Sequence, residues 1–147
     1  MTFWKSCVYG TFTKNADGSY DVDGDFAIHA NEAGGLKKLP VRFHEVTGSF
    51  DLSVCYDLIT LEGSPEIVGK CFHWKSCTSL EELRYFPKRA DLILLDTSKI
   101  YPKFNEWERT IVSDRKLFRK WLDEGQPDHE KFVHDSRGFV ASKKFGF

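Results

Sequence analysis

Acidic residues alternate through one short stretch and give the sequence its closest imitation of a metal site. Asp21, Asp23 and Asp25 take the first, third and fifth positions of a segment whose twelfth residue is Glu32, which is the carboxylate spacing of an EF-hand calcium loop. Such a loop needs glycine at its sixth position for a sharp turn, and this chain has Phe26 there. We therefore expect no metal ion and no other cofactor, and we interpret the three aspartates as the exposed face of a strand that could bind a basic partner surface.

A histidine and a carboxylate are also candidates for chemistry, because Asp51 and His73 lie 22 residues apart in a chain that repeats at that interval. A histidine beside a carboxylate can act as a general base. A small hydrolase or nuclease that uses this pair is thus one alternative function. The sequence contains no HExxH, GxSxG or Walker phosphate-loop motif, and we assign no catalytic residue.

The cysteines and the charge balance point to an ordinary protein of a reducing compartment. The cysteines form no CxxC pair, and we expect free structural thiols at Cys7, Cys55, Cys71 and Cys77. No apolar stretch approaches the roughly 18 residues of a membrane span, so we expect a cytoplasmic protein with no membrane partner. A net charge of -1 provides no field for sequence-independent nucleic-acid binding. A nucleic-acid-binding accessory role stays a second alternative, because basic and aromatic residues mix in 116–121 and 139–147.

The elements that must position these residues recur every 22 residues. Apolar residues, prolines and cysteines share this spacing in the sets Val46, Val68 and Ala90; Phe50, Phe72 and Leu94; Leu36, Leu58 and Leu80; Leu39, Leu61 and Leu83; Pro65 and Pro87; Cys55 and Cys77. A period in this range is typical of a solenoid, in which each repeat packs its apolar residues on the next. The pattern predicts one short parallel strand per repeat, over 48–55, 70–75 and 91–96.

Both ends of the chain depart from this repeat. Residues 2–28 predict a β-hairpin with strands over 3–12 and 19–28, in which Val22 to Phe26 matches the repeat 24 residues before Val46. The two extra residues fit the loop 31–35. Helical spacing predicts two helices in 105–124, separated by an N-cap at Ser113-Asp114 and stopped by Gly125, and another short helix after Pro127-Asp128. The tail 139–147 could be an edge strand or a mobile segment.

The fold expected from these patterns is α+β: a short parallel β solenoid of three to four rungs of about 22 residues, with an N-terminal β-hairpin cap and a C-terminal helical cap. It forms a single domain, 1–147, with the hairpin cap and first strand in 1–28, the rungs in 29–99, and the helical cap and tail in 100–147.

The segment 55–72, CYDLITLEGSPEIVGKCF, resembles the degenerate leucine-rich-like repeats of bacteriophage, bacterial and large-virus proteins. A unit there reads roughly Leu-Thr-Ser-Leu-Glu-Gly-Ala-Pro-x-x-Val-Gly-Gly-x-Phe, and the segment 77–83, CTSLEEL, is similar. The resemblance covers 22–96, although Lys70 replaces the second glycine of the unit and the Asn pair that precedes it in the family is missing. It implies a parallel solenoid and a phage origin, and it transfers no catalytic motif.

The remaining candidate site is the surface that the strands present. If Phe26, Phe50, Phe72 and Leu94 face inward, alternation predicts three outward rows: Ala27, Asp51, His73 and Leu95; His29, Ser53, Lys75 and Thr97; Asp25, Ser49, Cys71 and Ile93. We expect this array to bind a protein partner through His29, Asp51, Ser53, His73 and Lys75, or through Asp21, Asp23 and Asp25. The resemblance suggests a virus-encoded factor that modulates a host defence or nucleic-acid-processing protein. The terminal segments could instead cover this face, and the sequence leaves the partner's identity and the oligomeric state open.

Overall fold

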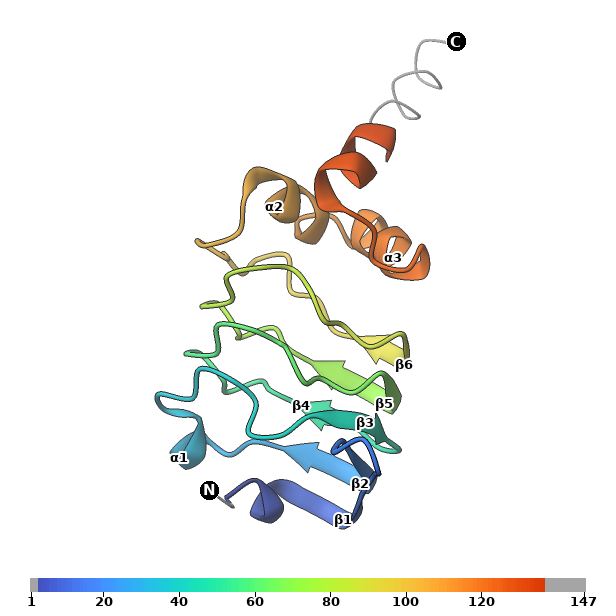
Figure 1. Ribbon diagram of the computed structural model, residues 1–147. Coiled ribbons are helices and arrows are strands. Elements are labelled where there is room, and N and C mark those ends of the chain that lie inside the picture. The colour runs from blue at the N-terminus through green and yellow to red at the C-terminus, as the bar shows by residue number, and fades with distance from the viewer. Residues whose placement is uncertain (1–2, 137–147) are drawn as a thin grey trace.

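The strands of successive repeats lie one above another in the computed structural model, which describes residues 3–136 (Figure 1). Val22 pairs with Val46, Val46 with Val68, and Val68 with Ala90, all in parallel. This confirms an α+β fold built on a three-turn parallel β-solenoid. Its strands are β2 (Tyr20–Ala27), β3 (Phe43–Val46), β4 (Phe50–Asp51), β5 (Ile67–His73) and β6 (Arg89–Ile93).

Stacked aromatic rings fill the interior of the solenoid. Phe26, Phe50 and Phe72 are fully buried, and their ring centroids are 5.1 and 5.7 Å apart with nearly parallel planes. Burying a phenylalanine side chain stabilises a fold by about 1.5–3 kcal/mol. The return segments add a second buried column from Leu58, Leu61, Leu80 and Leu83.

The N-terminal end is closed by the predicted hairpin, but its first strand is shorter than expected. Residues Phe3–Cys7 form a 3-10 helix, η1, and β1 covers only Val8–Lys14, antiparallel to β2. The strand prediction was wrong over 3–7, where the chain turns so that the Trp4 ring contacts Phe12 and Tyr20 of the hairpin. The two extra residues of the first repeat are accommodated by a short helix, α1 (Ala30–Ala33), and the glycines that follow it.

The strands begin earlier than the sequence predicted, and the second is interrupted. β5 starts at Ile67 and β6 at Arg89, while the second repeat has β3 before the predicted start at Gly48 and a two-residue β4 after it. At Gly48 the backbone approaches the first turn so closely that a Cβ atom would lie 1.9 Å from the Asp25 carboxylate. This close approach explains why glycine stands where β3 gives way to β4.

The last turn slips by one residue, which the 22-residue spacing did not predict. Val68 still pairs with Ala90, but Cys71 pairs with Leu92 and Phe72 with Ile93. A slip of one residue moves side chains to the opposite face of a sheet. Ile93, and not Leu94, therefore follows Phe72 in the stack, Leu95 is buried at 7% exposure, and Leu92 is 51% exposed.

The C-terminal end is closed by helices, and the second of them begins at the predicted cap Asp114. α2 (Glu106–Val112) begins with a capping box between Asn105 and Glu108, and α3 (Arg115–Asp123) begins with the Asp114 side chain as its N-cap. A further helical segment covers 129–136. The tail 139–147, for which the sequence left an edge strand and a mobile segment open, lies outside the described residues.

Side chains from this helical cap bind the backbone of the last return segment. The Leu83 N–H donates to Glu108 Oε2 at 2.7 Å, and His129 Nε2 donates to the Leu83 carbonyl at 2.7 Å. The Gln126 amide accepts from the Phe86 N–H at 3.2 Å and donates to the Phe86 carbonyl at 2.9 Å. These side chains satisfy backbone groups at the edge of the stack, as buried polar groups require.

Candidate recognition surface

The sheet presents outward rows, and the register corrects their last members. The pairing places Asp51 beside His73, as the sequence predicted. The slip replaces the predicted Leu95 and Ile93 in the last turn, because Leu95 is buried and Ile93 pairs with the buried Phe72. We define the outward face as the two corrected rows Ala27, Asp51, His73 and Leu94, and Asp25, Ser49, Cys71 and Leu92.

Asp51 and His73 are neighbours without a contact that would support catalysis. Asp51 Oδ1 accepts the Ser53 N–H at 2.8 Å, and the described contacts include no hydrogen bond or ion pair between the Asp51 and His73 side chains. Two large hollows lie elsewhere. One, of about 930 Å³, lies between the return segments and the chain after α3, and the other, of about 490 Å³, lies where α3 borders the starts of β5 and β6. Neither is lined by Asp51 or His73.

The acidic residues of β2 bind the second turn of the solenoid. Asp25 Oδ1 accepts the Ser49 N–H at 2.8 Å, and Asp23 Oδ1 accepts the Thr47 hydroxyl at 3.1 Å. Both aspartates are nevertheless exposed. They therefore contribute to the fold and still present negative charge to solvent.

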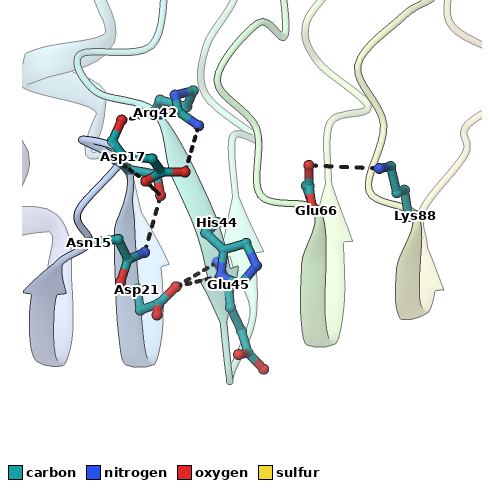
Figure 2. Close-up of polar contacts among 9 residues, drawn as sticks. Asn15, Asp17, Asp21, Arg42, His44, Glu45, Glu66 and Lys88 are labelled. Carbon is teal, nitrogen blue, oxygen red and sulfur yellow. Dashed lines mark hydrogen bonds and ion pairs between the residues drawn. The ribbon is translucent and has the colours of Figure 1, made fainter.

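Asp21 belongs to a polar cluster at the starts of the strands, which Figure 2 shows. Its Oδ1 lies 2.9 Å from His44 Nδ1 and 3.2 Å from the Glu45 N–H. Burial acts to raise the pKa of Asp21, but hydrogen bonds from His44, Asn15 and the Glu45 N–H outweigh it and lower the pKa. The same hydrogen bond to Asp21 raises the pKa of His44.

The other expected partner-binding residues occupy different parts of this surface. His29 precedes α1, and its Nε2 lies 3.0 Å from the Tyr9 hydroxyl of the hairpin. Ser53 and Lys75 lie in the turns that follow β4 and β5, and the Lys75 carbonyl accepts the Tyr101 hydroxyl at 3.1 Å. These three side chains are half-buried.

The sequence analysis missed three exposed apolar residues, of which only Leu92 lies on the outward face. Leu92 was expected inside an apolar run, and only the slip turns it outward. Tyr56 and Ile100 are 57% and 75% exposed. Each follows a β-turn at an equivalent point of its repeat: the N–H groups of Cys55, Cys77 and Lys99 each donate to the carbonyl three residues earlier. Tyr56 and Ile100 are two repeats, or 44 residues, apart. The equivalent position between them is the polar Thr78, so the sequence shows no continuous apolar pattern there.

The described terminal segments leave the outward face open. The hairpin and the helices pack on opposite ends of the solenoid (Figure 1), through Trp4 against Phe43 and through Phe118 against Trp74. Among the described helices of the termini, α3 alone borders the face, at the hollow of about 490 Å³ near Arg89 and Asp91. Within residues 3–136, the possibility that the chain termini cover this face is therefore not realised.

The buried cysteines are not suited to nucleophilic chemistry. Burial raises the pKa of Cys55 to about 12 and also raises the pKa of Cys77. Their thiols are protonated at neutral pH, whereas the thiolate is the nucleophile and the metal ligand. The described residues contain no group of three or more His, Cys, Asp or Glu side chains that could hold a metal ion.

The aromatic residues of α3 are buried, whereas its basic residues are exposed to solvent. Phe118 and Trp121 are buried in the cap, whereas Lys116, Arg119 and Lys120 are exposed. The two aromatic rings are therefore unable to stack on nucleic-acid bases. The similar mixture in 139–147 lies outside the described residues.

Comparison with protein-family models, with curated proteins and with solved structures finds no significant match. None of the helices in the described part of the chain has both the length and the apolar character needed to cross a bilayer.

Proposed function

We propose that this protein is a non-enzymatic recognition module that binds another protein through its outward face. The observation that carries the proposal is the outward orientation of Leu92, which the one-residue slip leaves 51% exposed on the sheet. Exposed apolar side chains surrounded by polar residues are typical of protein-binding surfaces when they form a patch. The half-buried Leu94 adjoins Leu92 in the neighbouring row.

The charges of the face favour a partner with basic groups. Asp25 and Asp51 belong to the outward face, and the exposed Asp23 lies beside it on β2, two residues before Asp25. Successive strands are about 4.8 Å apart, so a partner that covers Leu92 and Leu94 reaches these carboxylates across only two or three strands. Complementary charges mainly accelerate association and select the partner.

A virus-encoded factor that binds and modulates a host protein is the form of this function that the resemblance to phage-type repeats supports. A defence protein or a nucleic-acid-processing protein with a basic surface would match the acidic end of the face. This part of the proposal rests on the resemblance and on charge alone.

The test is affinity capture with three versions of the tagged protein: wild type, Leu92→Lys and Tyr56→Lys. Both substitutions place a lysine at an exposed apolar position, but only Leu92 lies on the outward face. We expect one protein to be recovered equally with wild type and Tyr56→Lys, and at least tenfold less with Leu92→Lys. Equal recovery with all three versions would remove the outward face from the proposal.

The hydrolase alternative has one favourable observation, the adjacent positions of Asp51 and His73. It is tested by nuclease and phosphodiesterase assays of wild type and His73→Ala. Turnover by the wild type that disappears in a folded His73→Ala protein would replace the binding proposal with an enzymatic one.

A further inference from the structure

The two ends of the solenoid differ in how their outermost backbone is satisfied. At the C-terminal end, Glu108, Gln126 and His129 bind the backbone of the last return segment. At the N-terminal end, β1 pairs with β2 along one edge, and no described strand pairs with its other edge. An unpaired strand edge is a row of hydrogen-bonding groups that another strand can join.

β1 also has little of the protection that edge strands usually have. Its sequence, VYGTFTK, contains no proline, and its one charged residue is Lys14 at the end. Six of its seven residues are exposed, including Tyr9 and Phe12. In natural proteins, edge strands are usually protected from pairing with another chain because they are very short or contain proline or inward-pointing charges.

We propose that a second copy of this chain pairs with β1 in an antiparallel manner, about a two-fold axis at Thr11. A two-fold interface brings the same surface of both copies together and therefore has to be self-complementary. With this register all seven residues of β1 overlap. The cross-strand pairs are then Thr11 with Thr11, Tyr9 with Thr13, Phe12 with Gly10 and Val8 with Lys14.

These cross-strand pairs favour a second copy of the chain as the strand that joins β1. Thr–Thr and aromatic–β-branched pairs are among the favourable cross-strand combinations, at roughly 0.2–1 kcal/mol each. The Phe12 ring packs against Trp4 and Tyr20 of its own chain, and its 39% exposed remainder would lie opposite the bare backbone of Gly10, where aromatic residues can cover edge glycines. The register places no two like charges opposite each other.

The acidic residues beside β1 do not oppose this pairing. Asp23 is the cross-strand neighbour of Thr11, so the two Asp23 residues of a dimer are separated by three inter-strand steps of about 4.8 Å, or about 14 Å. The Debye length at physiological ionic strength is about 8 Å, which screens this repulsion. The paired dimer joins the two sheets and gives the assembly two outward faces.

Analytical ultracentrifugation of the purified wild-type chain over a wide concentration range is the first measurement. We expect the mean mass to rise with concentration toward twice the monomer mass, because pairing one strand buries less than a standard stable interface. A short thiol cross-linker then tests the register. Thr11→Cys should give covalent dimers, whereas wild type and the matched control Thr13→Cys should not, since two copies of residue 13 would be four positions apart.

Charge substitutions at the axis complete the test without perturbing the core. Thr11→Lys and Thr11→Glu should each be monomeric and keep the wild-type circular dichroism, and a mixture of the two should regain the dimer mass. A wild type that stays monomeric at every concentration would overturn the proposal, and so would a dimer that persists in Thr11→Lys. These measurements need no partner protein, so their failure is distinguishable from a failure of the proposed recognition function.

Discussion

Gly63 and Tyr85 occupy equivalent positions in successive turns, 22 residues apart, and both adopt left-handed backbone conformations. Their φ angles are +95° and +71°. The left-handed region costs an ordinary L-residue roughly 1–2 kcal/mol, and it costs glycine almost nothing. The repeat therefore imposes the same left-handed conformation on both residues, and only Gly63 adopts it without steric cost.

Replacing Gly63 with alanine should lower the free energy of unfolding by about 1–2 kcal/mol. The added Cβ would also lie 3.1 Å from the Val41 carbonyl oxygen, which is tighter than ordinary contact. Urea denaturation followed by circular dichroism measures the change. Gly34→Ala is the matched control, because Gly34 has a φ of -61° and open space around its Cβ position. An equal loss in both variants would contradict the account of Gly63.

The Asp21–His44 pair should make stability depend on pH in a defined window. The pKa of His44 is raised by folding, so its contribution is present below the unfolded value of about 6.5 and is lost as pH rises through the folded pKa. The pKa of Asp21 is lowered, so its contribution is present above the unfolded value of about 3.9 and is lost as pH falls through the folded pKa. The pair therefore stabilises most between about pH 4 and 6.5.

His44→Gln should be less stable than wild type near pH 5.5, and the difference should diminish above about pH 8. The difference should stay below about 1 kcal/mol, because both side chains are more than 40% exposed and solvent screens them. Urea denaturation at several pH values of wild type, Asp21→Asn, His44→Gln and the double variant isolates the pair. A constant difference at all pH values would mean that the ion pair does not contribute.

Individual residues were predicted well from sequence where their role is local. The N-caps Asn105 and Asp114 and the stop at Gly125 depend on neighbours within a few positions, and Asp114 and Gly125 were predicted in these roles. The roles of Glu108 and Gln126 toward the solenoid were not, because their partners Leu83 and Phe86 lie 25 and 40 residues away. No sequence pattern indicates such distant hydrogen bonds.

At the scale of elements, the last strand shows that the repeat spacing alone does not determine which side chains of a strand point inward. The residues 92–95, LILL, offer an apolar side chain at every position, so periodicity alone cannot decide which of them point inward. The slip between Val68 and Cys71 decides it. The 22-residue spacing therefore predicted that the strand exists but assigned its faces incorrectly.

The slip predicts that truncating Leu95 costs much more stability than truncating Leu92. Leu95→Ala should destabilise the fold by about 2–4 kcal/mol, because it removes a buried side chain and leaves a cavity. Leu92→Ala should change stability by no more than about 0.5 kcal/mol, since the side chain is half-exposed on the surface. Thermal denaturation of both variants measures this, and similar losses would contradict the observed register.

The helical cap should depend on Glu108 more than on its neighbours. Glu108→Ala removes the acceptor of the buried Leu83 N–H and of the Asn105 N–H, and an unsatisfied buried donor costs about 1–3 kcal/mol. Glu106→Ala, in the same helical turn but exposed, should cost little. If the two variants are equally stable in urea, the contact with Leu83 does not hold the cap on the solenoid.

Across the whole molecule, aromatic contacts run without a break from one end cap to the other. Trp4 contacts Phe43, Phe43 contacts Phe26, and the Phe26–Phe50–Phe72 stack continues to Phe86 and then to Trp121 in α3. The sequence predicted the inner part of this column from its spacing. The junctions at Trp4 and Trp121 depend on how the termini fold back, which periodicity does not show.

Phe50→Ala interrupts this column at its centre and should lower the free energy of unfolding by about 3–5 kcal/mol. Because the column joins both caps, we expect tryptophan fluorescence and far-ultraviolet circular dichroism to report one coincident unfolding transition in wild type and variant. Tyr56→Ala, an exposed aromatic outside the column, is the control. Separate transitions for the two probes would show that the ends unfold independently.

The hydrogen bonds that join the side chains of Glu108, Gln126 and His129 to main-chain atoms have an evolutionary consequence. Main-chain donors and acceptors are available whatever the side chains beneath them, so a tandem duplication inside the gene that inserted one more unit, and kept the aromatic residues equivalent to Trp74 and Phe86, would offer the cap the same backbone groups to bind. Lengthening by whole units would then enlarge the area offered to a ligand without requiring a new terminus. Insertion of part of a unit would not be tolerated in this way, because it would move these backbone groups away from the side chains of the cap.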